Sequence, residues 1–189
     1  SNFFGNSAGR SSTDASASNF FGTDAGRSAP NAEQSNFFGL SAGSGATNSS
    51  QSNFFGSLSG FNAVDANNSN FFGQQAGRGA SNANNSNFFG PNAGFDAVNA
   101  ADATFFGDSA GRSAGNASNS FFVGSFAGNT ATNAANSFFF GINAGINDTV
   151  DNVTNPDDWS ILMGHYTNTG GFSNSILMGS GTSATPIAN

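Results

Sequence analysis

The chain contains no cysteine and no lysine, and it has few charged residues of either sign. Charged side chains make up 8% of its 189 residues, about a third of the usual share. The lack of cysteine excludes a disulfide framework, although it does not fix the cellular compartment. The formal net charge is −7 and four arginines supply all the fixed positive charge. This balance argues against nucleic acid as a partner, because phosphate binding needs a cationic face.

Neither a membrane-spanning segment nor a signal peptide is recognisable in the sequence. No apolar run is long enough to cross a bilayer, so we expect no membrane span. No signal peptide is recognisable, and Ser1 already lies within a repeat. We therefore expect a processed chain or a segment of a longer fibre.

The side-chain groupings of enzymes and metal sites are absent as well. His165 is the single histidine and serine is a background residue, so no Ser/His/Asp arrangement is credible. No glycine-rich turn is followed by lysine, as a phosphate-binding loop would require. His165 would bind a metal only where three copies met on an axis, and for Asp157 and Asp158 we favour a solvated loop over a cation site. We predict no enzyme, no catalytic or metal-binding residue and no cofactor.

What the chain does contain is a strict repeat of 17 residues. The glycine of Phe-Phe-Gly returns at this period for most of the sequence, and a second glycine follows it four residues later each time. A period this regular indicates one structural unit stacked on copies of itself. The first glycines are Gly5, Gly22, Gly39, Gly56, Gly73, Gly90, Gly107, Gly124 and Gly141.

Each unit begins Ser-Asn-Phe-Phe-Gly-x-x-Ala-Gly, as Ser1 to Gly9 show. Two glycines, several Asn and Ser residues and a β-prone Phe pair oppose a helix. Asn-Phe-Phe suits a short strand, and the two glycines suit corners. We predict an all-β fold, a β-solenoid (β-roll or β-helix) of 17-residue coils that are hydrogen-bonded to one another about 4.8 Å apart. The glycines predicted to form the coil turns include Gly5, Gly9, Gly22, Gly26, Gly39, Gly43, Gly73 and Gly77.

The Phe pair carries the main inference about assembly. Neighbouring strand residues point to opposite faces, so one Phe of each pair enters the coil and the other points outward, although the sequence does not say which. An outward column of about eight Phe residues would forgo on the order of 20 kcal/mol if left in water, and such patches mark interfaces. We predict that identical columns on identical chains cover one another in a homotrimer. One of the two columns, with Val123 in the eighth place, comprises Phe4, Phe21, Phe38, Phe55, Phe72, Phe89, Phe106 and Phe140.

Two further positions of the repeat follow patterns of their own. An Asp or Asn recurs nine residues after the first glycine, from Asp14 to Asn133, and we predict a stacked amide ladder there. The residue after the second glycine alternates between arginine and apolar residues, which indicates a position at the surface or rim. This variable column contains Arg10, Arg27, Ser44, Phe61, Arg78, Phe95, Arg112, Asn129 and Ile146.

The repeat breaks after Gly145, which divides the chain into three parts. Residues 1–146 are predicted to form a regular shaft and residues 147–159 an inserted loop. Residues 160–189 carry two Ser-Ile-Leu-Met-Gly frames, at Ser160 and Ser175, and are predicted to form looser related coils leading to a further C-terminal part.

The segment Asn70 to Gly77 (NFFGQQAG) resembles the Asn-Thr-Phe-(Val/Leu)-Gly-Tyr-Gln-Ala-Gly repeats of bacteriophage tail fibres and trimeric bacterial surface adhesins, which are also spaced 17 residues apart. The Ser-Ile-Leu-Met-Gly frames are similar to segments that precede a C-terminal chaperone domain in some such fibres. The resemblance covers residues 1–145 well and 160–189 loosely. It implies a homotrimeric β-solenoid used for attachment, on a virion tail or a bacterial cell surface.

Three functions compete at this level. The first is the structural and adhesive shaft of an extracellular fibre, which binds copies of itself and could contact a host-surface glycan or receptor. The second is a disordered transport-barrier protein, because Phe-Gly repeats with polar spacers resemble FG-nucleoporins, although the fixed spacing opposes it. The third is ice binding by a flat solenoid face, which normally uses ranks of threonine, and threonine is scattered here.

Overall fold

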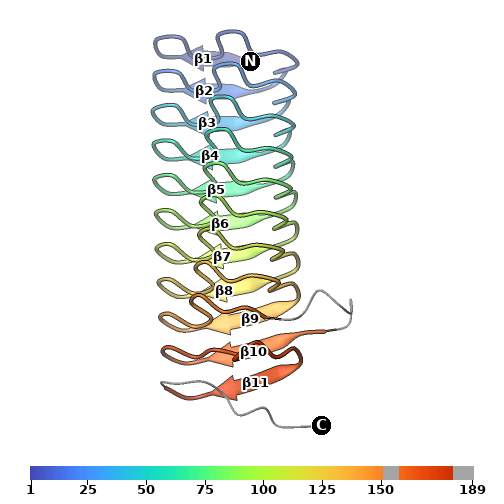
Figure 1. Ribbon diagram of the computed structural model, residues 1–189. Coiled ribbons are helices and arrows are strands. Elements are labelled where there is room, and N and C mark those ends of the chain that lie inside the picture. The colour runs from blue at the N-terminus through green and yellow to red at the C-terminus, as the bar shows by residue number, and fades with distance from the viewer. Residues whose placement is uncertain (151–157, 181–189) are drawn as a thin grey trace.

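A computed structural model of the chain describes residues 1–150 and 158–180, and these form one parallel β-solenoid (Figure 1). The coils stack along a single axis, and their strands lie above one another in one sheet of 11 strands ordered β1 to β11. The described residues contain no helix, which confirms the predicted all-β class. The strands are β1 (Asn2–Phe4), β2 (Asn19–Phe21), β3 (Asn36–Phe38), β4 (Asn53–Phe55), β5 (Asn70–Phe72), β6 (Asn87–Phe89), β7 (Thr104–Phe106), β8 (Phe121–Val123), β9 (Ser137–Phe140), β10 (Ser160–Met163) and β11 (Ser175–Met178).

The register of the sheet follows the sequence repeat. Each residue of one strand pairs with the residue 17 positions later, so that Phe3 lies beside Phe20 and Phe4 beside Phe21. The same register continues after the repeat breaks, because Phe139 pairs with Leu162 and Leu162 with Leu177. Ten strand spacings of about 4.8 Å give a rod about 48 Å long.

Hydrogen bonds between coils continue around the circumference outside the sheet. A second line of parallel bridges runs from Thr47 through Val64 and Ser81 to Thr149. At the corner between the two lines, Gly26 N–H donates to the Ala42 carbonyl at 2.8 Å. Each coil is therefore bonded to its neighbours on several sides, which satisfies the backbone polar groups of a thin coil.

The core is a narrow column of phenylalanine rings lined by alanine. The Phe two residues before the first glycine of each coil, from Phe20 to Phe139, is fully buried, and successive rings stack with centroids 4.6–4.8 Å apart. Alanines such as Ala76 and Ala80 are also fully buried where the walls come close. The two leucines Leu162 and Leu177 continue the column into the last coils, Leu162 fully and Leu177 partly buried.

A column of buried serines lies immediately before the strands, and the sequence interpretation did not identify it. Ser52 Oγ donates to the Ala66 carbonyl at 2.6 Å and accepts a hydrogen bond from Ser69 N–H at 3.1 Å. The same pair of bonds recurs from Ser18 to Ser86, and Ala103 replaces serine in the seventh coil. The recurrence of serine before every Asn-Phe-Phe was the available signal, but its low hydrophobicity concealed a buried role.

The glycines predicted at the coil turns occupy two different corners. Gly5, Gly22, Gly39 and Gly73 follow a strand with φ between 135° and 142°, which excludes ordinary side chains. The second group turns with φ of 62° to 64° and lies against the core rings: Gly9, Gly26, Gly43 and Gly77.

The predicted inserted loop at 147–159 falls partly on residues 151–157, which lie outside the described residues. Asn147 to Val150 keep the coil's hydrogen bonds, since Asn147 N–H donates to Asn129 and Val150 N–H to Thr132. The end of the ninth coil therefore extends to Val150, which is fully buried. Of the predicted looser coils at 160–189, residues 181–189 also lie outside the described part.

Asp148 connects the ninth coil to the irregular coil that follows. Its carboxylate is 1% exposed and accepts hydrogen bonds from Thr169 N–H at 2.6 Å and Thr169 Oγ1 at 2.7 Å. Burial raises the pKa of this carboxyl above its usual range, and the bonds from Thr169 partly oppose the rise. The column that ends in Asp148 is occupied by Ser12 in the first coil and by alanine from Ala29 to Ala131, so a buried acid appears in it only where the coil geometry changes.

Candidate interaction surface

The direction in which the chain closes decides which Phe of each pair faces inward. In each Asn-Phe-Phe triplet from β2 to β6 the first Phe lies in the core, and the second points away from it, on the outer face of the sheet. Because strand residues alternate, the Asn that opens each strand also lies on this outer face. We call the surface formed by the first and third residues of the Asn-Phe-Phe triplets, and by their partners in β7–β11, the outer sheet face.

The outward Phe residues form the column predicted as an oligomer interface. In the middle of the rod their rings stack nearly parallel, with centroids 4.7 Å apart between Phe38 and Phe55. The most exposed members are Phe4 at the N-terminal end, at 75%, and Phe106 beside the smaller Val123, at 57%. The predicted column is complete in the structure, and its members are Phe4, Phe21, Phe38, Phe55, Phe72, Phe89, Phe106 and Phe140.

Stacking changes the energy assigned to this column. Phe21, Phe38, Phe55 and Phe89 are each half-buried, because the ring above and the ring below cover their faces. The figure of about 20 kcal/mol for an uncovered column is therefore too high, since it counts fully exposed rings. What remains in water is mainly ring edges. A partner of this column contacts those edges, since the ring faces are already paired.

Beside the Phe column runs an amide ladder that the sequence interpretation missed. Asn36 Nδ2 donates to Asn53 Oδ1 at 2.8 Å, and Asn53 Nδ2 donates to Asn70 Oδ1 at 2.8 Å. The ladder extends from Asn2 to Asn87 along six strands. The strand alternation that placed Phe4 outward also places Asn2 outward, so the amide ladder could have been predicted from the sequence.

The predicted ladder of Asp and Asn residues lies on another side of the coil and is confirmed for most of its length. Asn31 donates to Asn48 at 2.8 Å and Asn48 to Asp65 at 2.7 Å. A second run of such bonds extends from Asn82 to Asn133.

The variable column after the second glycine contains all four arginines of the chain. Arg78 lies between two aromatic rings, with its guanidinium carbon 5.7 Å from the Phe61 centroid and 5.3 Å from the Phe95 centroid. Arg112 lies over Phe95 from the other side at 5.3 Å. From Phe61 to Arg112 this alternation explains why the position accepts both residue types, because the guanidinium groups of Arg78 and Arg112 stack on neighbouring rings.

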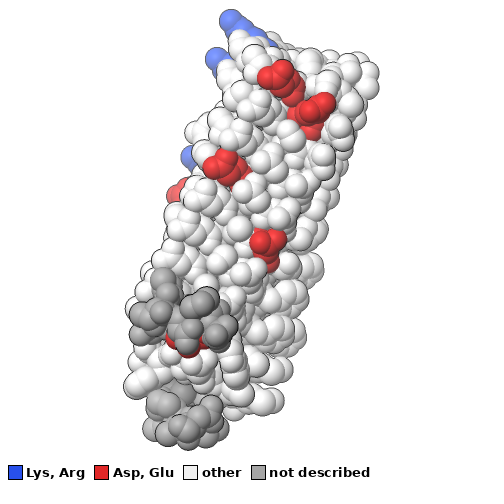
Figure 2. Space-filling view, turned by 90° about the vertical axis from the view of Figure 1, so that its right-hand side faces the viewer, with Lys and Arg blue, Asp and Glu red and all other residues white. Residues whose placement is uncertain are grey.

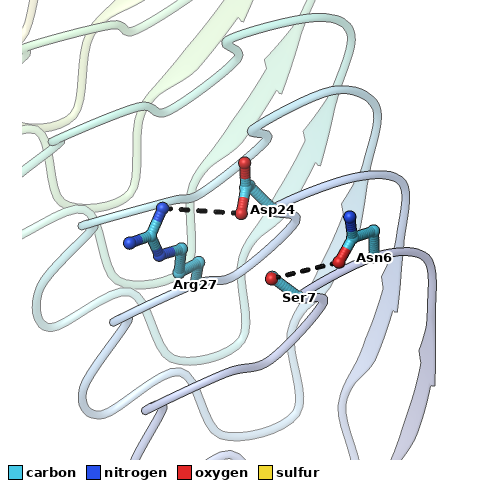
Figure 3. A network of polar contacts seen from close by, with 4 residues as sticks. All are labelled: Asn6, Ser7, Asp24 and Arg27. Atoms are coloured by element: carbon cyan, nitrogen blue, oxygen red, sulfur yellow. Dashed lines mark hydrogen bonds and ion pairs between the residues drawn. The ribbon is translucent and has the colours of Figure 1, made fainter.

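Charge is distributed unevenly around the rod. Figure 2 shows acidic groups scattered over one side, with the basic groups gathered along one edge. Arg27 and Asp24 form the one ion pair found in the described part of the chain, at 3.6 Å (Figure 3). On the preceding coil Ser7 donates to Asn6 Oδ1 at 3.3 Å. The pair at Arg27 is half exposed, so its contribution to stability is small.

Of the residues considered for metal binding, the structure describes Asp158 and His165. Asp158 is buried and accepts a hydrogen bond from Asn174 Nδ2 at 2.7 Å, where a solvated loop was expected. Asp157 lies outside the described residues. His165 is exposed and its ring lies 4.3 Å from that of Tyr166. Among the described residues no three His, Cys, Asp or Glu side chains gather closely enough to hold a metal ion.

The described part of the chain also contains no helix that is long and apolar enough to cross a membrane.

A scan against models of protein families finds no match to this chain, and a search of curated proteins finds none either.

Proposed function

We propose that this chain is the structural shaft of an extracellular fibre, and that it associates with copies of itself through the outer sheet face. The observation that carries the proposal is the character of this face. The first and third residues of β1 to β8 and the second and fourth residues of β9 to β11 include no charged side chain, although the chain carries a net charge of −7.

An all-parallel sheet supports this proposal on general grounds. Such sheets are almost always covered on both faces, and here the coil covers only the inner one. Since like-charged copies repel through their acidic surfaces, an uncharged face is the side on which two copies approach at least cost.

The repeat itself favours a second copy as the partner. Ring edges recur along the face at a spacing of 4.7–4.8 Å in the middle of the rod, from Phe21 to Phe72. A partner with another period would lose register within a few coils, whereas an identical chain matches over the whole length. Three copies around one axis would hide all three Phe columns, so we propose a homotrimer.

We propose attachment as the role of such a fibre, on a virion tail or a bacterial surface. In the middle of the rod the Phe column is a poor glycan platform, because the ring faces from Phe21 to Phe72 are paired with one another and mainly their edges are free. The run of stacked amides from Asn82 to Asn133, on another side of the coil, offers exposed or partly exposed hydrogen-bonding groups instead. We propose that contact with a host-surface glycan or receptor uses these amides or a tip beyond the shaft.

Two alternatives receive less support. A transport-barrier protein depends on disorder, and the described residues form an ordered solenoid. Ice binding normally uses a continuous rank of threonines. The bridged column from Thr47 to Thr149 interrupts that rank with Val64, Ser81, Val98 and Gly115.

Light scattering coupled to gel filtration tests the proposal. We expect a particle of about 57 kDa, three times the chain mass of 19.0 kDa. Phe55→Asp places a charge in the Phe column and should give monomers, whereas Leu40→Asp, at a 54% exposed position outside the strands, should not. Circular dichroism checks that both variants fold. A monomeric wild-type chain at high concentration would overturn the proposal, and a dimer would overturn the trimer.

A further inference from the structure

The outer sheet face changes its chemistry along the rod. From β1 to β6 it presents asparagine beside phenylalanine, and in β7 Thr104 replaces the asparagine. From β8 onward both positions are apolar. The eight side chains of β8–β11 form what we call the C-terminal apolar patch: Phe121, Phe138, Ile161 and Ile176 in one column, and Val123, Phe140, Met163 and Met178 in the other.

This patch is large for a surface in water. Phe121 is 41% exposed, Phe140 48%, Ile176 48% and Met178 69%, and the other four side chains are half-buried. With about 200 Å² for a large side chain, the four exposed residues alone present roughly 400 Å². Patches of this size on soluble proteins mark interaction sites. Two such patches in contact would bury close to the roughly 1,000 Å² that a specific interface needs, and the adjoining Phe column adds to it.

The patch fits a second copy better than another partner. It carries no charge that would select an oppositely charged protein. Its two columns run side by side along the rod, and each continues one of the two outward columns of β1–β7. Outer sheet faces with one strand spacing match along their whole length when copies lie side by side around one axis, and packed sheets lie about 10 Å apart with interdigitating side chains.

The amide ladder on the outer sheet face, from Asn2 to Asn87, favours one relative direction of the two copies. Each amide has two donor hydrogens and two acceptor lone pairs, and a ladder bond on either side uses only one of each. In an antiparallel arrangement the ladder of one copy would lie against the apolar patch of the other, so the remaining amide groups would lose water without gaining partners. A parallel arrangement places amides opposite amides and apolar residues opposite apolar residues.

We propose that the C-terminal apolar patch docks on the same patch of a second copy, so that the copies associate in parallel and in register. The proposal rests on the self-association proposed above and adds its direction and its principal contact. The strongest contact lies at β8–β11, and the amide-bearing strands β1–β6 align behind it.

The absence of cysteine allows a direct test by single-cysteine cross-linking. Asn19→Cys on β2 and Met178→Cys on β11 lie on the same face, about 43 Å apart along the rod by strand spacing. A thiol cross-linker of about 10 Å, the distance between packed sheets, cannot span that length. Leu40→Cys, exposed but off the face, reports random collisions.

We expect Asn19→Cys and Met178→Cys each to form covalent products with themselves, and mixtures of mass-tagged variants to form no Asn19–Met178 product. Mixed products without self-products would overturn the parallel arrangement while leaving self-association intact. No product from either variant, together with a monomeric mass, would overturn both proposals. Equal yields from Leu40→Cys would show random collision and would also overturn the arrangement.

A pair of charge variants tests the patch itself. Met178→Glu and Phe4→Glu change the most exposed outward residue at each end of the same face, at 69% and 75% exposure. Since an unpaired charge in a dehydrated patch is costly, Met178→Glu should raise the concentration for half-association by about tenfold or more. Phe4→Glu should raise it much less. An equal or larger effect of Phe4→Glu would overturn the patch as the principal contact.

Discussion

Replacing Gly77 by alanine should destabilise the fifth coil, whereas replacing Gly115 by alanine should leave the seventh coil intact. An added Cβ at Gly77 would lie 2.6 Å from Phe71 Cγ, with other ring atoms closer still. At Gly115 the nearest atom to such a Cβ would be Thr132 Cγ2, at 3.9 Å. The two variants add the same methyl group, and their sites differ in the nearby core ring and in the left-handed φ of Gly77.

Backbone conformation alone does not explain why Gly77 is glycine. Its φ is 62°, but Gln75, Asn82 and Asn85 in the same coil also have φ between 49° and 60°. A left-handed residue costs roughly 1–2 kcal/mol, which this fold accepts repeatedly. The ring contact therefore has to supply the larger part of the effect.

The Phe71 ring has no room to move away from an added methyl group. It stacks between Phe54 and Phe88, with centroids 4.7 Å away on both sides. Overpacking in such a core costs about 1–3 kcal/mol, so the total for Gly77→Ala is about 2–5 kcal/mol. Gly115→Ala should be neutral or stabilise by up to about 1 kcal/mol, because its φ is not in the left-handed region and alanine reduces unfolded-state entropy.

Urea unfolding followed by circular dichroism measures the difference between the two variants. Because coils contact only their neighbours, hydrogen exchange should show the loss of protection in the fourth to sixth coils for Gly77→Ala. Equal stability of the two variants, or a greater loss for Gly115→Ala, would refute the reasoning from ring contact.

Three further predictions follow from buried rings, a buried carboxyl and a stacked arginine. Phe71→Ala should cost about 3–5 kcal/mol of unfolding free energy, and Phe72→Ala in the monomer should cost much less, because Phe71 is fully buried and Phe72 is 36% exposed. Similar losses for the two variants in urea unfolding would contradict the inward direction of Phe71 and the outward direction of Phe72. Burial raises the pKa of Asp148, so the folded state binds its proton more tightly than the unfolded state and stability falls as pH rises from the unfolded pKa through the higher folded pKa. Asp148→Asn should flatten that part of a melting-temperature profile against pH, and an unchanged profile would exclude Asp148 as its source. Arg78→Gln should cost about 1–2 kcal/mol because two ring contacts are lost, and the loss in urea unfolding should persist in high salt, unlike that of an exposed ion pair.

The sequence alone determined the period, the strand-and-corner form of the coil and the existence of an outward Phe column. These features are local: a fixed spacing of glycines sets the corners, and alternation along a strand sends Phe71 and Phe72 to opposite sides whatever the tertiary structure. The stacked row from Asn82 to Asn133 was predictable for the same reason, since identical residues one period apart must lie beside one another.

Only the tertiary structure decided which Phe is inside, because that depends on the direction in which the chain closes into a coil, and a three-residue strand carries no record of it. Closure also placed Ser52 in the core, where its hydroxyl accepts a hydrogen bond from Ser69 of the next coil, and brought Thr169 to Asp148 across the break in the repeat. Each of these contacts joins residues from different turns of the solenoid. Their partners are set by how the coils stack, so the order of residues within one repeat could not reveal them.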